Sequence, residues 1–262
     1  MKNSQTLRQL VANAQASPKV KGIFFTGSTA KTIGKHSDID LVIILNRNSS
    51  HIRSLYTLVE RHFADIFFFD LPFLQKLLPK KSFSGNALEG IFVTWLRQGK
   101  IMYDPTNILQ HLQSRLEARK PLVVAEQEKW DVWVKVNYMR MENERYYRAR
   151  NRTYTAALEL QLLYSVTELI TAFFTFRGIP WRGEKNALAY LTGRDPKTLA
   201  AFTSFVHSTS LSDKMSAYRK LFNRTHTKKF APWGKQFTIP LTNENHYSRK
   251  LEPFWRTISR KS

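Results

Sequence analysis

The sequence predicts an α/β (α+β) fold in two parts, a small mixed-sheet domain over residues 1–110 and an α-helical bundle with a basic tail over residues 111–262. Three observations predict it. Strand and helix patterns alternate in the first third of the chain, and apolar stripes at helical spacing dominate the rest. The composition is that of a globular protein, with 42% hydrophobic and 13% aromatic residues. A chain of 262 residues is long enough to build both cores.

The first part alternates helices, strands and turns. Leu7, Leu10 and Val11 recur at helical spacing, Gly27-Ser28 interrupts the first apolar run, and β-branched residues fill the second strand. A stripe formed by Ile52, Leu55, Leu58 and Val59 predicts a helix over residues 51–62. The expected elements are helix 4–15, strand 22–25, helical turns 29–33, strand 38–45, helix 51–62, strand 65–69, helix 73–78, helix 86–97 and edge strand 99–103.

The pattern after residue 110 is helical. Apolar residues from Leu162 to Phe174 follow the 3.6-residue period closely, and Gly178 and Pro180 end that helix. The expected helices are 124–149, 155–177, 184–191, 196–206 and 211–222. The remaining residues mix proline, aromatic and basic residues without a clear period.

The charge balance points to anionic partners. The chain holds 41 Lys and Arg against 20 Asp and Glu, a formal net charge of +21. A field of that sign attracts polyphosphates, nucleic acids and anionic surfaces, although any single basic patch is equally compatible with an ordinary solvated surface. The absence of cysteine excludes disulfides and thiolate metal sites and favours a cytoplasmic location. No apolar run approaches the roughly 20 residues that span a bilayer, so no membrane association is expected.

An acidic pair is the first candidate for chemistry. Asp38 and Asp40 stand two apart at the start of a strand, so both side chains point to the same face. Two neighbouring carboxylates repel each other unless a cation lies between them, and hard oxygen ligands suit Mg²⁺ or Mn²⁺. The alternative is an ordinary solvated strand end, because Asp-x-Asp alone is common.

The turn before this pair and the strand after it extend the candidate site. Gly27 can adopt positive φ and let a phosphate approach the backbone, and Ser28 can donate a hydroxyl, although Gly-Ser turns are usually structural. Asp65 and Asp70 are five residues apart on one strand, so they face opposite sides and only one of them can join the pair. We expect Asp65 to join it and Asp70 to cap the turn into Leu71.

Together these residues resemble the DNA-polymerase-β-like nucleotidyltransferase superfamily. Its signature is a hydrophobic residue, Gly, Gly or Ser, a spacer, and Asp-x-Asp or Asp-x-Glu. Here nine residues separate Gly27-Ser28 from Asp38-Ile39-Asp40, and Ala30 and Ser37 also match the family's form. Lys31 stands where the family often has Arg, whereas Thr32 replaces the usual glycine. Gly99 to Asp104 resembles the strand that closes many of these small domains. The resemblance covers residues 20–104.

The resemblance implies two-metal phosphoryl transfer from an NTP, with Mg²⁺ or Mn²⁺ and with ATP as the expected nucleotide. Asp38 and Asp40 would hold the metal on the phosphates, and Asp65 would share the second metal and help to deprotonate the acceptor hydroxyl. The expected nucleotide-binding residues are Gly27, Ser28, Lys31 and Ser37. Either Lys31 or Lys35 could neutralise the leaving pyrophosphate, or serve only as a surface charge.

The layout resembles the antibiotic nucleotidyltransferases of the lincosamide and kanamycin types. That similarity implies transfer of an NMP to a hydroxyl of a small molecule, with a carboxylate base from the helical domain. Glu159 is the first candidate for that base and Glu168 the second, although either could be an ordinary surface residue.

Other functions remain open. The net charge favours an anionic acceptor such as tRNA or another RNA, and the acceptor could also be a protein, as in toxin–antitoxin relatives. Basic aromatic segments at residues 145–152 and 224–261 suit RNA, although helix-end charge and core aromatics explain them as well. A third reading is an inactive family member that binds nucleic acid, which the intact carboxylates argue against. A homodimer through Trp130, Trp133 and Phe173-Phe174 is an alternative to core packing of those residues.

Overall fold

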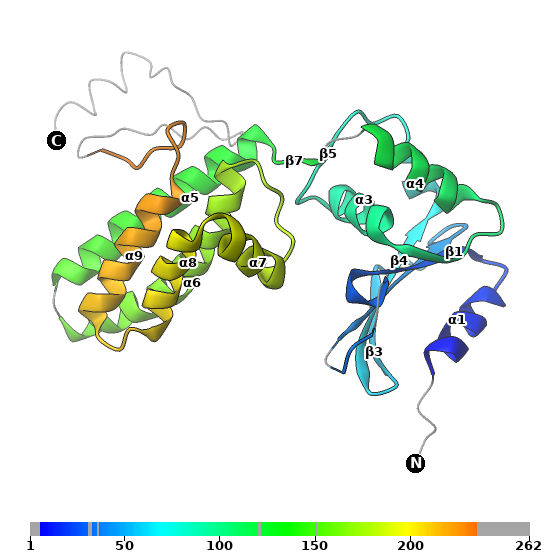
Figure 1. Ribbon diagram of the computed structural model, residues 1–262, viewed down its shortest axis with the longest axis horizontal. Helices are drawn as coiled ribbons and strands as arrows, with labels where there is room; N and C mark the ends of the chain where they lie inside the picture. The colour runs from blue at the N-terminus through cyan, green and yellow to red at the C-terminus, as the bar shows by residue number, and fades with distance from the viewer. Residues whose placement is uncertain (1–5, 31–32, 36, 120–121, 150, 235–262) are drawn as a thin grey trace. The chain divides into compact units, whose positions relative to one another are not determined.

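The computed structural model describes residues 6–30, 33–35, 37–119, 122–149 and 151–234 (Figure 1). The chain forms two compact units, Met1–Leu122 and Val123–Ser262. The first unit extends past residue 110 because helix α4 (Ile108–Arg119) shares a core with α3 (Leu88–Gln98). Leu109 and Leu112 of α4 are buried in that core together with Phe92 and Leu96 of α3.

A five-stranded mixed sheet organises the first unit, as the sequence predicts. Its strands lie in the order β3-β4-β2-β1-β6, with β6 at an edge. Strands β2 and β4 are parallel, and the other neighbouring pairs are antiparallel. The strands are β1 (Val20–Thr26), β2 (Ile39–Leu45), β3 (Ser54–Val59), β4 (His62–Asp70) and β6 (Lys100–Tyr103).

Each face of this sheet is covered by different helices (Figure 1). Helix α1 (Leu7–Gln15) covers the face on which Leu41 and Ile43 of β2 are buried with Val11. Helices α3 and α4 cover the opposite face, where Val42 and Ile44 are buried. Because side chains alternate along a strand, even-numbered residues of β2 share the α3 face. This alternation also decides the face on which a polar residue of β2 lies.

The segment predicted as a helix over residues 51–62 is instead strand β3 and a hairpin turn. Glu60 and Arg61 connect β3 to β4 with φ values of 51° and 69°. Two central residues with positive φ are typical of the type I′ turn, whose twist matches that of an antiparallel hairpin. The helical prediction was wrong because pairing with β4 overrides the apolar spacing of this short segment.

Asp70 ends β4 and begins helix α2 (Leu71–Leu77), as predicted. Its carboxylate accepts a hydrogen bond from the backbone N–H of Phe73, at 3.0 Å, and so caps the helix. A second sheet, which the sequence analysis missed, pairs β5 (Phe83–Ser84) with β7 (Leu122–Val123). Two-residue strands carry too little pattern to be predicted from sequence.

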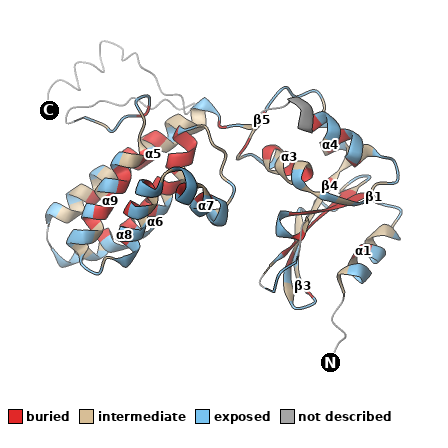
Figure 2. Ribbon diagram, viewed as in Figure 1, coloured by how far each residue is buried: buried red, intermediate tan, exposed pale blue. Residues whose placement is uncertain are grey.

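The second unit is helical, as predicted. Its elements are α5 (Glu126–Ala149), α6 (Arg152–Phe176), α7 (Glu184–Arg194), α8 (Pro196–His207) and α9 (Leu211–Thr225). Figure 2 shows buried residues along these helices. Trp133, Phe173 and Phe174 belong to their shared core and are almost completely buried, and Trp130 packs against it. Core packing therefore accounts for the burial of Trp133, Phe173 and Phe174.

Helix α6 forms the centre of this core. By length and composition alone it could cross a membrane, and half of its most apolar stretch is buried inside the unit. The core helix of a globular unit passes the same test. Leu162, Val166, Leu169 and Ile170 are buried among the other helices, so α6 serves here as a core helix.

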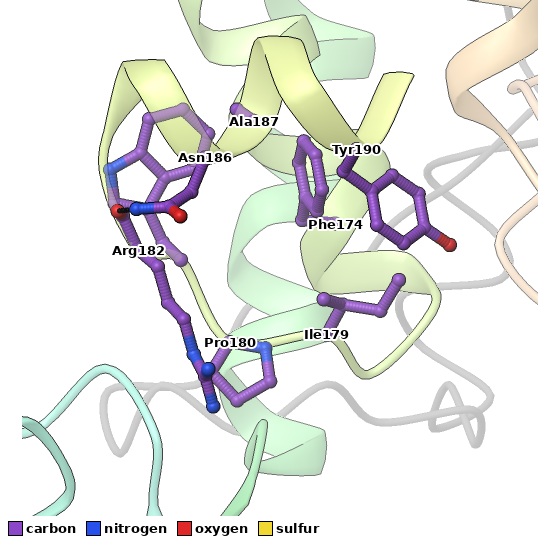
Figure 3. Close-up of a pocket in the computed structure, with 8 residues that line it drawn as sticks. Phe174, Ile179, Pro180, Arg182, Asn186, Ala187 and Tyr190 are labelled. Atoms are coloured by element: carbon purple, nitrogen blue, oxygen red, sulfur yellow. Dashed lines mark hydrogen bonds between the residues drawn. The ribbon is translucent and has the colours of Figure 1, made fainter. Parts of the chain in front are cut away.

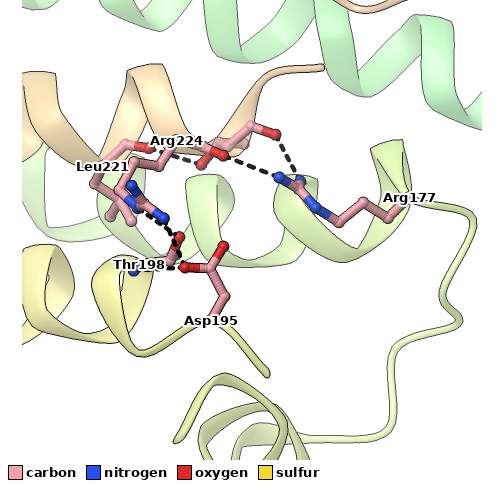
Figure 4. A network of polar contacts seen from close by, with 6 residues as sticks. Arg177, Asp195, Thr198, Leu221 and Arg224 are labelled. Carbon is pink, nitrogen blue, oxygen red and sulfur yellow. Dashed lines mark hydrogen bonds and ion pairs between the residues drawn. The ribbon is translucent and has the colours of Figure 1, made fainter. Parts of the chain in front are cut away.

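An arginine network fixes the end of α9 (Figure 4). Arg224 donates to Asp195 at 2.7 Å and to the hydroxyl of Thr198 at 2.9 Å, both at the start of α8. Arg177 donates to the backbone carbonyls of Thr225 and Arg224, at 2.9 and 3.1 Å. These carbonyls lie at the helix end, where backbone acceptors lack intrahelical partners. Arg224, the first residue of the basic tail, is therefore engaged within the unit.

Candidate active site

The turn after β1 brings the backbone of Gly27 against the side chain of Asp40. Gly27 has φ +57°, a conformation that residues with a Cβ rarely adopt. A Cβ built at this position would lie only 2.2 Å from Oδ2 of Asp40. Glycine is therefore needed both for the backbone conformation and for the space that the carboxylate occupies. Ser28 follows it and is exposed.

Thr29 connects this turn to the acidic strand, and the sequence analysis missed it. Its hydroxyl donates to the backbone carbonyl of Asp38 at 3.1 Å and accepts from the backbone N–H of Asp40 at 2.9 Å. The residue is 6% exposed, so few water molecules can replace these bonds. Thr29 therefore holds the backbone on both sides of Ile39. The only signal in the sequence is a threonine directly after Gly-Ser.

The sheet register aligns the carboxylates. In the parallel pair β2–β4, Asp40 lies opposite Asp65, and in the antiparallel pair β1–β2, Thr26 lies opposite Asp40. Residues that pair across neighbouring strands point to the same face. Asp40 and Asp65 therefore project side by side from the α3 face. Asp70, an odd number of residues later, instead caps α2.

Asp65 is in an electrostatically unfavourable environment. Its Oδ1 is buried and has no hydrogen-bond partner among the described residues. Burial raises the pKa of the Asp65 carboxyl above its ordinary value, and the nearby Asp38 carboxylate raises this pKa further. A cation between the two carboxylates would offset both effects. Asp38, the source of this charge effect, is exposed.

The loop before Asp38 is held by hydrogen bonds between side chains and the backbone. Nδ1 of His62, at the start of β4, lies 2.8 Å from the carbonyl oxygen of Ser37. The hydroxyl of Ser37 accepts from the backbone N–H of Gly34 at 3.0 Å, so this side chain stabilises the loop. Lys35 is exposed on the same loop. Lys31, an expected nucleotide-binding residue, lies outside the described residues.

The carboxylates fit a divalent cation that is shared with a substrate. Within the described part of the chain, no three His, Cys, Asp or Glu side chains form a ready-made metal site. Mg²⁺ usually takes only one or two carboxylates and completes its shell with substrate phosphates and water. The partnerless oxygen of Asp65 and the repulsion from Asp38 suit that type of binding.

The predicted bases of the helical domain lie in the second unit. Glu159 is exposed on α6, and Glu168 forms an ion pair with Lys135 at 2.6 Å. The basic aromatic segment 145–152 is partly engaged in local contacts. Arg145 forms an ion pair with Glu142, at 2.7 Å, and Arg148 donates to the backbone carbonyl of Glu144. Residues 150 and 235–262 of the two basic segments lie outside the described residues.

A cavity of about 250 Å³ lies in the second unit, between the end of α6 and the start of α7 (Figure 3). Phe174, Trp181 and Tyr190 give it an aromatic lining, and Arg182 is the charged residue on its wall. Asn186 donates to the backbone carbonyl of Arg182 at 2.7 Å and so stabilises the loop. None of the lining residues is acidic, so this cavity offers no carboxylate for a cation.

Comparison with known proteins bears on the first unit above all. A family model described as a nucleotidyltransferase domain matches residues 7–140, a span that contains Gly27, Asp38, Asp40 and Asp65. Among solved structures, a nucleotidyltransferase-like protein from Exiguobacterium sibiricum 255-15 is similar, with 12% sequence identity and a TM-score of 0.43. The match covers 83% of this chain and 72% of that one. No curated protein matches the chain significantly.

Proposed function

Because the chain belongs to the nucleotidyltransferase domain family, we propose that it transfers a nucleoside monophosphate from an NTP to a hydroxyl group, with Mg²⁺ or Mn²⁺. One observation carries the proposal. The register places Asp40 beside Asp65, and Gly27 lies directly against the Asp40 carboxylate. A glycine turn next to paired carboxylates is an arrangement that suits nucleotidyl transfer.

The turn after β1 is the proposed site for the triphosphate. Gly27 and Ser28 are exposed, and Ser28 can donate its hydroxyl to a phosphate oxygen. Ser37 and the basic residues Lys31 and Lys35 belong to the same proposed nucleotide site, with ATP as the expected nucleotide. The positive charge of the two lysines would stabilise the pyrophosphate as it leaves.

Asp65 is the proposed base for the acceptor. The acceptor oxygen forms a bond to the α-phosphorus, the bond from that phosphorus to the bridging oxygen breaks, and pyrophosphate leaves. The proton of the hydroxyl moves to Asp65. Asp65 can take this proton because its Oδ1 has no hydrogen-bond partner among the described residues.

The metal is proposed to lie between Asp38, Asp40 and Asp65 and the phosphates. Bound there, a divalent cation would neutralise the charge on the transferred phosphoryl group and favour ionisation of the acceptor hydroxyl. Thr29 and Gly27 would position the ligands, since one holds the backbone around Asp40 and the other packs against its side chain.

The acceptor expected from the two-domain layout is a small hydroxylated, antibiotic-like molecule, with exposed Glu159 as a further candidate base. A polycationic acceptor is poorly matched to a chain with a net charge of +21. That charge instead favours an anionic acceptor such as RNA. The activity test therefore has to include acceptors of both kinds.

The test is transfer of label from each α-³²P-NTP in the presence of Mg²⁺, with bulk tRNA, a lincosamide and an aminoglycoside as acceptors. Asp65→Asn removes the proposed base and Asp40→Asn a metal ligand, whereas Asp70→Asn alters an acid on the same strand that caps α2 and accepts from the backbone N–H of Asn48. We expect acceptor-dependent labelling that both site variants abolish and that Asp70→Asn retains. Labelling that survives Asp40→Asn would refute the proposed site, and so would failure of the wild type to bind any NTP with Mg²⁺.

A further inference from the structure

An exposed aromatic pair lies beside the carboxylates. In the antiparallel pair β3–β4, Tyr56 lies opposite Asp65 and Leu58 lies opposite Phe63. Tyr56 and Phe63 therefore share the face that carries Asp40 and Asp65. Tyr56 is 61% and Phe63 is 52% exposed. The sheet face next to the proposed base thus presents two large uncovered rings.

The two rings form a platform. Their centroids lie 6.0 Å apart and their planes are 13° from parallel. This separation corresponds to offset stacking and not to a face-to-face sandwich, so part of each ring face remains open. Rings on a protein surface that lie parallel and open to solvent are suited to stack against another planar ring.

The platform lies on the acceptor side of the proposed site. The strand order β3-β4-β2-β1 places Tyr56 on β3, Asp65 on β4, Asp40 on β2 and the Gly27 turn after β1. A triphosphate at that turn is separated from Tyr56 by the two carboxylate strands. A group that binds Tyr56 would therefore approach Asp65 from the side opposite the triphosphate, where an attacking hydroxyl must lie.

Two arginines flank the platform and can contact the phosphates of an anionic ligand. Arg53 directly precedes β3, and Arg61 lies in the hairpin turn. Both are exposed, and neither forms an ion pair with another described residue. Glu60, between the two strands, is already engaged by the backbone N–H of Leu7 at 3.3 Å. Open aromatic rings flanked by free arginines are typical of single-stranded nucleic acid binding.

We propose that Tyr56 and Phe63 stack the terminal base of a single-stranded RNA acceptor and so place its terminal ribose hydroxyl at Asp65. This inference rests on the proposed transferase function and specifies its acceptor. Arg53 and Arg61 bind the preceding phosphates. The stacking surface tolerates any base, because every base presents a flat ring.

The test measures coupling between the rings and the terminal base. Two short fluorescent RNAs are compared by anisotropy at one fixed salt concentration, one ending in adenosine and the other in an abasic ribose. The combined variant Tyr56→Ala/Phe63→Ala removes the platform. Leu55→Ala is the matched control, because Leu55 is 49% exposed on the same strand and points to the opposite face.

We expect the platform variant to bind the adenosine-ended RNA about tenfold more weakly than the wild type. Binding of the abasic RNA should not change, since its phosphates are the same and the stacked base is missing. Leu55→Ala should match the wild type on both RNAs. Thermal unfolding verifies that each variant is folded, and the exposure of both rings predicts little change in stability.

Three outcomes would overturn the inference. Equal weakening on both RNAs would mean that the rings do not contact the terminal base, and unchanged binding would mean that they bind no RNA. A concentration-dependent dimer that only the platform variant disrupts would assign the surface to a second copy of the chain. Binding is measured without NTP, so it does not depend on transfer. If the rings bind the terminal base but the protein transfers no label, only the proposed transferase function is refuted. If the protein labels a small molecule but the rings do not bind the terminal base of the RNA, only the RNA acceptor is refuted.

Discussion

Replacing Gly27 with alanine tests the geometry on which the proposed site depends. The added Cβ would lie 2.2 Å from Oδ2 of Asp40, whereas Cβ atoms essentially never approach another heavy atom within 3.0 Å. The carboxylate therefore has to move by roughly 1 Å, because the neighbouring backbone is fixed by the sheet and by Thr29. The turn itself also has to hold an alanine at φ +57°.

The two consequences differ in size. An L-residue in the left-handed conformation costs about 1–2 kcal/mol, which lowers the stability of the protein without unfolding it. A misplacement of about 1 Å in a catalytic group can reduce turnover roughly a hundredfold. We therefore expect Gly27→Ala to lose NMP transfer far more completely than it loses stability.

The assay is transfer of label from the α-³²P-NTP, combined with urea unfolding of the same samples. Gly34→Ala is a matched control on the following loop, because its φ is not in the left-handed region and its Cβ would meet only Oγ of Ser37, at 3.4 Å. We expect this control to retain transfer. If Gly27→Ala transfers label at the wild-type rate, the contact between this turn and Asp40 has no role in catalysis.

Three further predictions follow from polar and titratable groups. Thr29→Val leaves the Asp38 carbonyl and the Asp40 N–H without their partner, so the free energy of unfolding should fall by about 1–3 kcal/mol; a urea midpoint equal to that of the wild type would contradict this. The raised pKa of Asp65 means that its charged form destabilises the folded protein at neutral pH, so Asp65→Asn should raise the thermal midpoint while abolishing transfer. Mg²⁺ should stabilise only the wild type. A midpoint of Asp65→Asn below that of the wild type would disprove the reasoning. Burial lowers the pKa of His226 to about 4 from 6.5. The stabilisation that comes from keeping this histidine neutral is therefore fully present above pH 6.5, and the free energy of unfolding should fall by about 3 kcal/mol as the pH drops to 4. In unfolding titrations, His226→Gln should weaken this pH dependence.

The strands around the carboxylates could be predicted because their signals are local. β-Branched and aromatic runs in β1, β2 and β4 are bounded by turn residues, and the two-residue period places Asp38 and Asp40 on one face. The odd spacing of Asp65 and Asp70 likewise separated a candidate site residue from a predicted helix cap, and the cap is present. These inferences need only the geometry of one strand.

Other features depend on contacts between distant segments. Thr29 contacts residues nine and eleven positions later, and no local pattern reveals these bonds. Tyr56 and Phe63 meet only because the Glu60–Arg61 turn folds β3 onto β4. Because residues 51–62 were predicted as a helix, the aromatic platform was not predicted either.

Aromatic stripes pose a different difficulty. Trp133 and Phe173 have the same helical spacing whether they pack inside one chain or between two copies. The spacing shows that one face is apolar but does not show what covers it. Here the other helices of the second unit cover that face, and both residues are almost completely buried.

The sheet core explains why the site can retain an unfavourable carboxylate. Leu41 and Ile66, which directly follow Asp40 and Asp65, are buried on the α1 face, and Val42 is buried on the α3 face. A slip of one residue between β2 and β4 would exchange these faces and expose the apolar side chains. The core thus fixes the register that holds Asp40 beside Asp65, and the two carboxylates cannot separate without disrupting it. A bound cation would offset the repulsion of Asp65 by Asp38 without any movement of the strands.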